Sequence, residues 1–181
     1  MRLISLFLAI GCFTACTDVH RTERLDKLDE LSVKLEEEAS KPFDELALSI
    51  DSALEQSNKL FESFMSNYSE DTIALNLALQ IDEFKKLTNE LSVEKEELKF
   101  IQMEVSSRIG NVESLRKDIK NDAGNRSKYD DNIMFEINQV TALFDRALET
   151  RTLIQNGLEI FKEMYPELLI ACNAITKDNA E

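Results

Sequence analysis

Apolar residues recur alternately three and four residues apart through most of this chain of 181 residues. Such heptad spacing places one apolar stripe along an α-helix, and it is typical of helices that pack lengthwise. The longest stripe consists of Ile133, Ile137, Val140, Phe144, Ala147, Arg151, Ile154, Leu158, Phe161, Tyr165, Leu168, Cys172 and Ile175. Arg151 is its one charged member. The stripe predicts a long helix in the C-terminal third of the chain.

Two earlier stretches follow the same rule. The first contains Leu28, Leu31, Leu35, Phe43, Leu46, Ile50, Ala53, Ser57, Leu60 and Phe64. The second contains Leu77, Ile81, Phe84, Leu87, Leu91, Leu98, Ile101, Val105, Ile109, Val112, Leu115 and Ile119. The whole chain has four Gly and two Pro, and it contains no convincing alternation of the kind that strands require. The pattern therefore predicts an all-α fold.

The two prolines mark candidate breaks in this pattern. Residues 40–42 read Ser-Lys-Pro, which is able to end one helix and start another, with Ser40 as the N-cap and Pro42 in the first turn. Pro166 is expected to kink or end the third helix, because proline has no N–H to donate and clashes with the preceding turn.

Two polar segments predict turns. Residues 67–71 form the first, with Ser69 as the N-cap of the next helix. Residues 121–127 form the second, with Gly124 at positive φ and Ser127 as the following cap. Since short turns make neighbouring helices antiparallel, we expect an elongated up-down-up three-helix bundle, or coiled coil, with a short C-terminal helix. The predicted helices span about 22–66, 70–120 and 127–164, with the short helix ending near 176. The bundle domain would cover 22–176, and 177–181 would be a disordered tail.

The first residues have a different character. Arg2 is followed by an apolar run from Leu3 to Phe13, and small residues then precede Cys16. A charged segment, a short apolar segment and a small-residue site are the marks of an export signal. A membrane span needs about 20 apolar residues, and this run is shorter. The sequence therefore predicts a signal peptide at 1–15 and a membrane-proximal tether at 16–21.

The small residue before Cys16 makes this segment similar to a bacterial lipoprotein signal. That resemblance implies that Cys16 carries lipid, with acyl chains such as palmitate inserted in one membrane leaflet. Two or more chains anchor a protein stably. Cys12, preceded by Gly11, is the alternative site, but it leaves a shorter apolar run. If Cys16 is processed and acylated, Cys172 is the one remaining thiol, and no intramolecular disulfide is possible.

Charge and chemistry exclude several function classes. The net charge of −14 argues against nucleic acid as a partner, because phosphate binding needs a basic surface. His20 is the single histidine and falls in the predicted tether. The acidic runs at 36–38 and 94–97 are interpreted as solvated helix faces. Residues 118–125 do not have the spacing of a calcium loop. We therefore expect no enzyme activity, no cofactor and no metal site, and we expect Cys172 to be a buried, inert thiol.

Charge is also distributed unevenly along the chain. Between 29 and 71 there are twelve acidic and three basic residues, whereas 112–131 holds five of each. In an up-down-up bundle tethered at Cys16, the turn at 121–127 returns to the membrane end. Because anionic head groups repel acidic protein, this neutral end is expected to face the bilayer more easily than the acidic one.

The lipoprotein-like signal, the all-helical mature chain and the run from Leu115 to Tyr129 together resemble uncharacterised lipoproteins of double-membrane bacteria. The resemblance implies a location in the cell envelope and supplies no functional residues. We therefore expect a membrane-anchored structural or protein-interaction module, bound to another envelope protein or to itself through helices. The alternative is a periplasmic carrier or chaperone that holds apolar cargo between helices, for which the small residues Ser57, Ala147 and Gly157 are weak indications.

Overall fold

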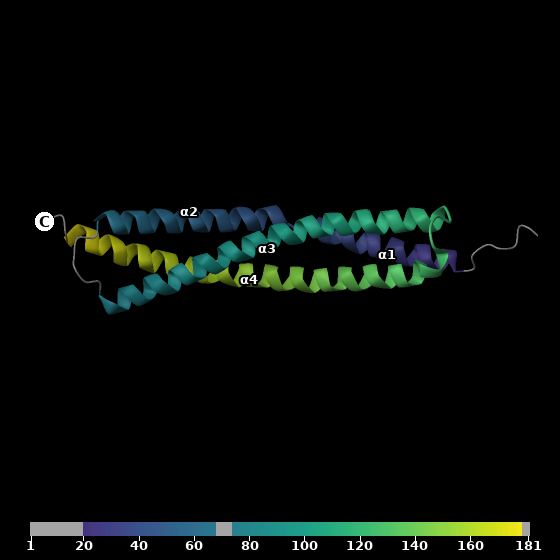
Figure 1. Ribbon diagram of the computed structural model, residues 1–181. Helices are drawn as coiled ribbons and strands as arrows, with labels where there is room; N and C mark the ends of the chain where they lie inside the picture. Colours follow the sequence, from purple (N-terminus) through teal and green to yellow (C-terminus); the bar gives the residue numbers. More distant parts are fainter. Residues whose placement is uncertain (1–19, 68–73, 179–181) are drawn as a thin grey trace, which may run out of the picture.

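The computed structural model describes residues 20–67 and 74–178. This part of the chain consists of helices and turns, with no strand, as the apolar spacing predicts. Its helices are α1 (Arg21–Ala39), α2 (Phe43–Asn67), α3 (Leu75–Lys120) and α4 (Tyr129–Asp178), and the short 3-10 helix η1 (Arg126–Lys128) precedes α4. The all-α fold class is confirmed, and three long helical segments pack together (Figure 1).

The first of these segments is broken into two helices, α1 and α2. They follow one another along the same side of α3 and α4. We call α1 and α2 together the first leg. Asp29 in α1 pairs with Arg116 near the end of α3, and Asp51 in α2 pairs with Lys95 near its middle. Positions later in the first leg thus meet positions earlier in α3, so the two run in opposite directions. The prediction of a single helix over 22–66 is wrong, because α1 ends at Ala39 and α2 begins at Phe43.

The break between α1 and α2 has a clear local cause. The Ser40 N–H donates to the Glu36 carbonyl and its hydroxyl donates to the Glu37 carbonyl, so Ser40 caps the end of α1. This corrects the prediction that Ser40 is the N-cap of α2. Pro42 precedes the first residue of α2, and its carbonyl accepts from the Leu46 N–H. Proline suits this position, because the N–H that it lacks would have no helical partner there.

The turn between α3 and α4 confirms one detail of the prediction and corrects another. Gly124 has φ of 83°, the positive value expected of it. The cap of η1 is Asn125, whose side chain accepts from the Ser127 N–H, so Ser127 is not the capping residue. The Tyr129 hydroxyl lies 2.5 Å from the Ala123 carbonyl and 3.2 Å from the Asp118 carbonyl, and it ties the turn to the start of α4.

Pro166 does not end the last helix, because α4 continues without interruption to Asp178. The predicted boundary at 164 and the separate short C-terminal helix are therefore wrong. An interior proline costs about 3 kcal/mol. Leu168 and Cys172 beyond it are 2% and 4% exposed, and burying a leucine-sized side chain yields about 1.5–3 kcal/mol. Packing of the last turns thus offsets the proline. The predicted disordered tail begins within α4, and 179–181 lie outside the described residues.

Candidate interaction face

The apolar stripe of α4 is buried on one side and partly open on the other. From Ile133 to Leu168 every second member is at most 5% exposed, and we call these the buried row: Ile133, Val140, Ala147, Ile154, Phe161 and Leu168. The members between them are only partly buried, and we call these the open row: Ile137, Phe144, Arg151, Leu158 and Tyr165. The row ends at Cys172, which is 4% exposed. An apolar row that its own bundle covers incompletely is a candidate contact surface for another molecule.

A close approach of α4 to α3 accounts for this asymmetry. Leu143, Thr150 and Gly157, seven residues apart on the α3 side of α4, are all buried. A Cβ atom built on Gly157 would lie 2.8 Å from Leu91 Cδ2, so only glycine permits this spacing without a shift of Leu91. Because α4 is rotated towards α3, the open row on its opposite side faces the groove beside the first leg.

Two hollows lie in that groove. The first, of about 490 Å³, lies between α1 and α4, and its apolar floor consists of Leu31, Ile137, Val140 and Phe144. The second, of about 460 Å³, lies between α2 and α4, and its apolar floor consists of Ala53, Leu158, Phe161 and Tyr165. Each hollow therefore contains two members of the open row.

A buried ion pair separates the two hollows. Glu38, at the end of α1, is 4% exposed and accepts hydrogen bonds from Arg151 in the open row and from Lys41 in the break. The Arg151 guanidinium carbon also lies 5.6 Å from the ring centroid of Phe43, at the start of α2. Both charged partners are held by further polar or aromatic contacts, which buried ions require.

The interpretation of 36–38 as a solvated face is therefore wrong for Glu38. Glu36 and Glu37 are exposed, as expected. Glu38 lies three residues after Leu35 and therefore occupies the next position of the apolar stripe of α1. Arg151 likewise occupies a position in the apolar stripe of α4. Two opposite charges in facing apolar stripes were the sequence signal that could have predicted their pairing.

Other candidate residues are placed as follows. His20 lies at the exposed start of α1, 3.6 Å from Glu23. Cys172 is buried, and burial raises the pKa of its thiol, as expected of an unreactive cysteine. Burial, followed by the nearby charges of Glu97 and Glu149, raises the pKa of Glu94, so this carboxyl is only partly solvated. Within 20–67 and 74–178, no group of His, Cys, Asp and Glu could hold a metal ion.

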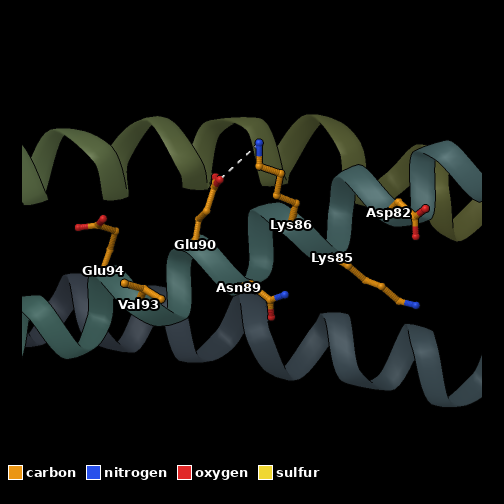
Figure 2. Close-up of a pocket in the computed structure, with 7 residues that line it drawn as sticks. All are labelled: Asp82, Lys85, Lys86, Asn89, Glu90, Val93 and Glu94. Atoms are coloured by element: carbon orange, nitrogen blue, oxygen red, sulfur yellow. Dashed lines mark ion pairs between the residues drawn. The ribbon is translucent and has the colours of Figure 1, made fainter.

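A further hollow is lined by side chains of α3 alone. It has about 520 Å³ and lies along the outer side of α3 between Asp82 and Glu94. Figure 2 shows that its side chains point in several directions and do not converge, and that Lys86 and Glu90 pair with each other, 3.8 Å apart. Catalysis needs acidic, basic and nucleophilic groups that meet at one point. This surface is an ordinary charged helix face.

The predicted lipidation site, Cys16, and its alternative Cys12 lie outside the described residues, as do the signal peptide at 1–15, most of the tether and the cap at Ser69. Among the helices that the structure describes, none has both the length and the apolar character of a membrane span.

Comparison with known proteins adds no assignment. No family model, no curated protein and no solved structure matches this chain.

Proposed function

We propose that this protein is a membrane-anchored lipoprotein of a bacterial cell envelope, in which an elongated up-down-up bundle acts as a structural or protein-interaction module without catalysis. The observation that carries the interaction role is the half-buried open row on α4. The sequence before α1, with Cys16 after a short apolar run, supports the anchor.

The chain path supports an orientation for the anchored bundle. Arg21 at the start of α1 lies 3.8 Å from Asp122 in the turn between α3 and α4, and Arg24 pairs with Asp130 at 2.7 Å. The end of α2 and the end of α4 lie at the opposite end of the molecule (Figure 1). If lipid at Cys16 holds the start of α1, the turn at 121–127 is the part of the bundle closest to the bilayer.

Packing at the small seam residues favours this role over that of a cargo carrier. A carrier needs an internal cavity, and small residues that face one another would supply it. Ala147 is fully buried, and the Leu91 side chain fills the space beside Gly157. The Ser57 hydroxyl donates to the Ala53 carbonyl within the same helix. All three small residues are thus buried in a packed interior, which favours a packed stalk.

The anchor is tested by a Cys16→Ser variant, followed by metabolic acyl labelling and membrane fractionation, with Cys12→Ser as the matched control. We expect Cys16→Ser to lose the label and to leave the membrane or accumulate as precursor, because the thiol is the acceptor of the lipid. Cys12→Ser should remain labelled. If Cys16→Ser remains labelled, Cys12 is the residue that carries the lipid. If no form of the chain is labelled, the proposal is wrong.

The interaction role is tested by crosslinking in intact cells followed by purification. A protein crosslinked to the bundle supports the proposed module. Apolar cargo that co-purifies with the chain in place of a protein would support the carrier instead.

A further inference from the structure

Exposed apolar residues lie where α3 and α4 meet on the side away from the first leg. The Arg146 guanidinium carbon in α4 lies 5.1 Å from the ring centroid of Phe100 in α3. Gly157, later in α4, lies beside Leu91, earlier in α3, so the two helices are antiparallel. One heptad back along α3 therefore matches one heptad forward along α4. This register pairs three positions of each helix, which we call the α3–α4 strip: Phe100 with Arg146, Val93 with Leu153, and Lys86 with Ile160.

The position of Lys95 shows which side of the bundle carries the strip. Lys95 pairs with Asp51 in α2, so it marks the side of α3 that faces the first leg. Val93 lies two residues before it, and two residues turn an α-helix by about 200°. Leu153 likewise lies two residues after Arg151 of the open row. The strip therefore faces away from both the first leg and the open row.

Four members of the strip leave apolar surface in contact with solvent. Val93 and Phe100 are 66% and 54% exposed, and Leu153 and Ile160 are 47% and 45% exposed. The two residues on each helix are one heptad apart and the helices are adjacent, so the four form one patch. A contiguous exposed apolar patch marks a contact surface for another molecule.

Acidic residues border this patch. They recur at multiples of seven residues in one row on α3 and one on α4, which contain Glu83, Glu90, Glu97, Glu104, Glu149 and Glu163. The two cations of the strip already have partners in these rows. Lys86 pairs with Glu90 at 3.8 Å. Arg146 pairs with Glu97 at 2.8 Å and with Glu104 at 2.6 Å. Two cations thus face six glutamates, and the strip keeps an excess of negative charge.

That excess acts on a neighbouring group. Glu94 lies three residues before Glu97 on α3, and its pKa is raised first by burial and then by the charges of Glu97 and Glu149. Glu97 therefore still repels negative charge although it pairs with Arg146. Figure 2 shows the Glu90 side chain pointing towards α4, so acids lie along the seam between the two helices. Cations from a bound molecule would offset this repulsion.

The regular spacing favours a helix as the bound molecule. The strip repeats about every 10.5 Å on both helices, and a further helix laid along them presents side chains at the same interval. The segments of this chain outside the described residues do not supply it, because 1–19, 68–73 and 179–181 contain one basic residue, Arg2. A second copy carries a net charge of −14 and would bring acidic surface against these glutamates. The helix therefore belongs to another protein.

We propose that the α3–α4 strip binds a helix of another protein, in which apolar residues at heptad spacing are flanked by Lys or Arg. The apolar side chains cover the patch, and the cations lie beside Glu149 and Glu163. This inference goes beyond the proposed function, because it adds a surface separate from the open row and states the charge of its partner.

Peptide binding to the full chain tests the proposal. One fluorescent peptide of three heptads has Leu at the heptad core positions and Lys elsewhere, and a second carries Glu in place of every Lys. Fluorescence anisotropy measures both affinities for the unchanged chain and for four variants. Circular dichroism checks that each variant is folded, which we expect because every changed residue is exposed.

The first two variants form a matched pair that alters apolar contact. Leu153→Ser removes a member of the strip, whereas Leu148→Ser removes an exposed leucine four residues after Phe144 of the open row. We expect Leu153→Ser to weaken binding of the Lys peptide at least about fivefold and Leu148→Ser to change it less than about twofold, because only Leu153 lies under the bound helix. Equal effects, or a larger effect of Leu148→Ser, would overturn the proposal.

The other two variants form a matched pair that alters charge. Glu149→Gln combined with Glu163→Gln removes two acids beside the strip, and Asp26→Asn combined with Glu62→Gln removes two exposed acids of the first leg. Net charge is the same in both variants. We expect the first to weaken binding of the Lys peptide at least about fivefold and the second to change it less than about twofold, because only the first removes charge beside the bound helix.

The Glu peptide should bind at least about tenfold more weakly than the Lys peptide, because its charge matches that of the strip. Absence of binding by the Lys peptide, equal binding of both peptides, or equal effects of the two charge variants would each contradict the proposal.

Sedimentation of the chain without peptide tests the other occupant. We expect Leu153→Ser to leave the oligomeric state unchanged. A dimer that Leu153→Ser dissociates would show that a second copy covers the strip, and it would overturn the proposal. These outcomes are separate from those of the anchor and crosslinking experiments, because peptide binding requires neither lipid nor the natural partner.

Discussion

The α1 half and the α2 half of the bundle share one apolar core but differ in the contacts that are added to it. In the α1 half, ion pairs connect the helices, including Arg24 with Asp130 and Arg116 with Asp29. In the α2 half, an aromatic cluster fills the centre, where the ring of Phe84 lies 5.3 Å from that of Phe161 and 5.8 Å from that of Phe61. Exposed ion pairs contribute little to stability, whereas buried aromatic rings contribute much. The aromatic cluster should therefore contribute more to stability than the ion pairs, while the core of the α1 half is aliphatic and includes Leu28, Leu35 and Ile119.

The largest expected effect comes from the aromatic cluster. Phe84 is fully buried, so Phe84→Ala should lower the free energy of unfolding by about 3–5 kcal/mol, because it removes a ring and leaves a cavity. Arg116→Gln in the α1 half should lower it by less than about 1 kcal/mol, since this arginine is largely exposed. Urea unfolding measures both. Equal losses in the two variants would contradict the contrast between the halves.

The boundary between the halves should give the next largest effect. Arg151→Met leaves Glu38 buried without its main partner and should cost about 3 kcal/mol, while Lys41 still pairs with it. Combined with Glu38→Leu, the same change should recover most of that loss, because no uncompensated charge remains. A double-variant cycle in urea measures the coupling. If the two losses simply add, the pair does not act as a unit.

Replacing one glycine in each half by alanine should have smaller effects on stability, and the two effects should have opposite signs. Gly157→Ala should lower stability by about 1–3 kcal/mol, because its Cβ would approach Leu91 in a packed core. Gly110→Ala in the α1 half has open space around the new Cβ and should raise stability by up to about 1 kcal/mol through helix propensity. Thermal unfolding compares the two. Stabilisation by both changes would show that α3 and α4 are less closely packed at Gly157.

The smallest effects concern pH and also have opposite signs in the two halves. A hydrogen bond from Arg24 lowers the pKa of Asp130, so this carboxylate stabilises the α1 half near neutral pH and loses that effect as the pH falls through its folded-state pKa. Burial raises the pKa of Glu94, so its ionised form opposes folding of the α2 half near neutral pH, and the penalty disappears on acidification.

Two variants that replace a carboxyl group by an uncharged amide test this difference. Asp130→Asn should weaken the protein at pH 7 and have a smaller effect at pH 3, whereas Glu94→Gln should strengthen it at pH 7. Hydrogen exchange at both pH values assigns each change to its half. Effects of the same sign at pH 7 would contradict the assignment.

The sequence predicted the helices well, because apolar spacing reports directly on which residues face the core. It correctly placed the break at 121–127 and marked 40–42 as a candidate break, where proline, glycine and polar side chains act locally, although the predicted helix over 22–66 ran through the second of these. It failed where distant packing decides the outcome. The continuation of α4 past Pro166 depends on burial of Leu168 and Cys172, and the burial of Glu38 depends on Arg151 in another helix.

The candidate site was less predictable than the fold. The spacing treated all members of the α4 stripe as equivalent, although Phe161 is buried and Leu158 is half-buried. Their difference arises from the rotation of α4 towards α3 around Gly157, and a single helix pattern contains no information about that rotation. The open row therefore emerged only from the packed bundle.

The proposed lipid at Cys16 would hold the α1 end of the bundle at the membrane. Fluorophores attached at Ala123 in the turn or at Ser66 near the end of α2, both exposed, would report this in vesicles that contain a quencher on the lipid head groups. The account predicts strong quenching at Ala123 and little at Ser66, and loss of both signals in Cys16→Ser. Quenching at Ser66 that exceeds that at Ala123 would contradict it.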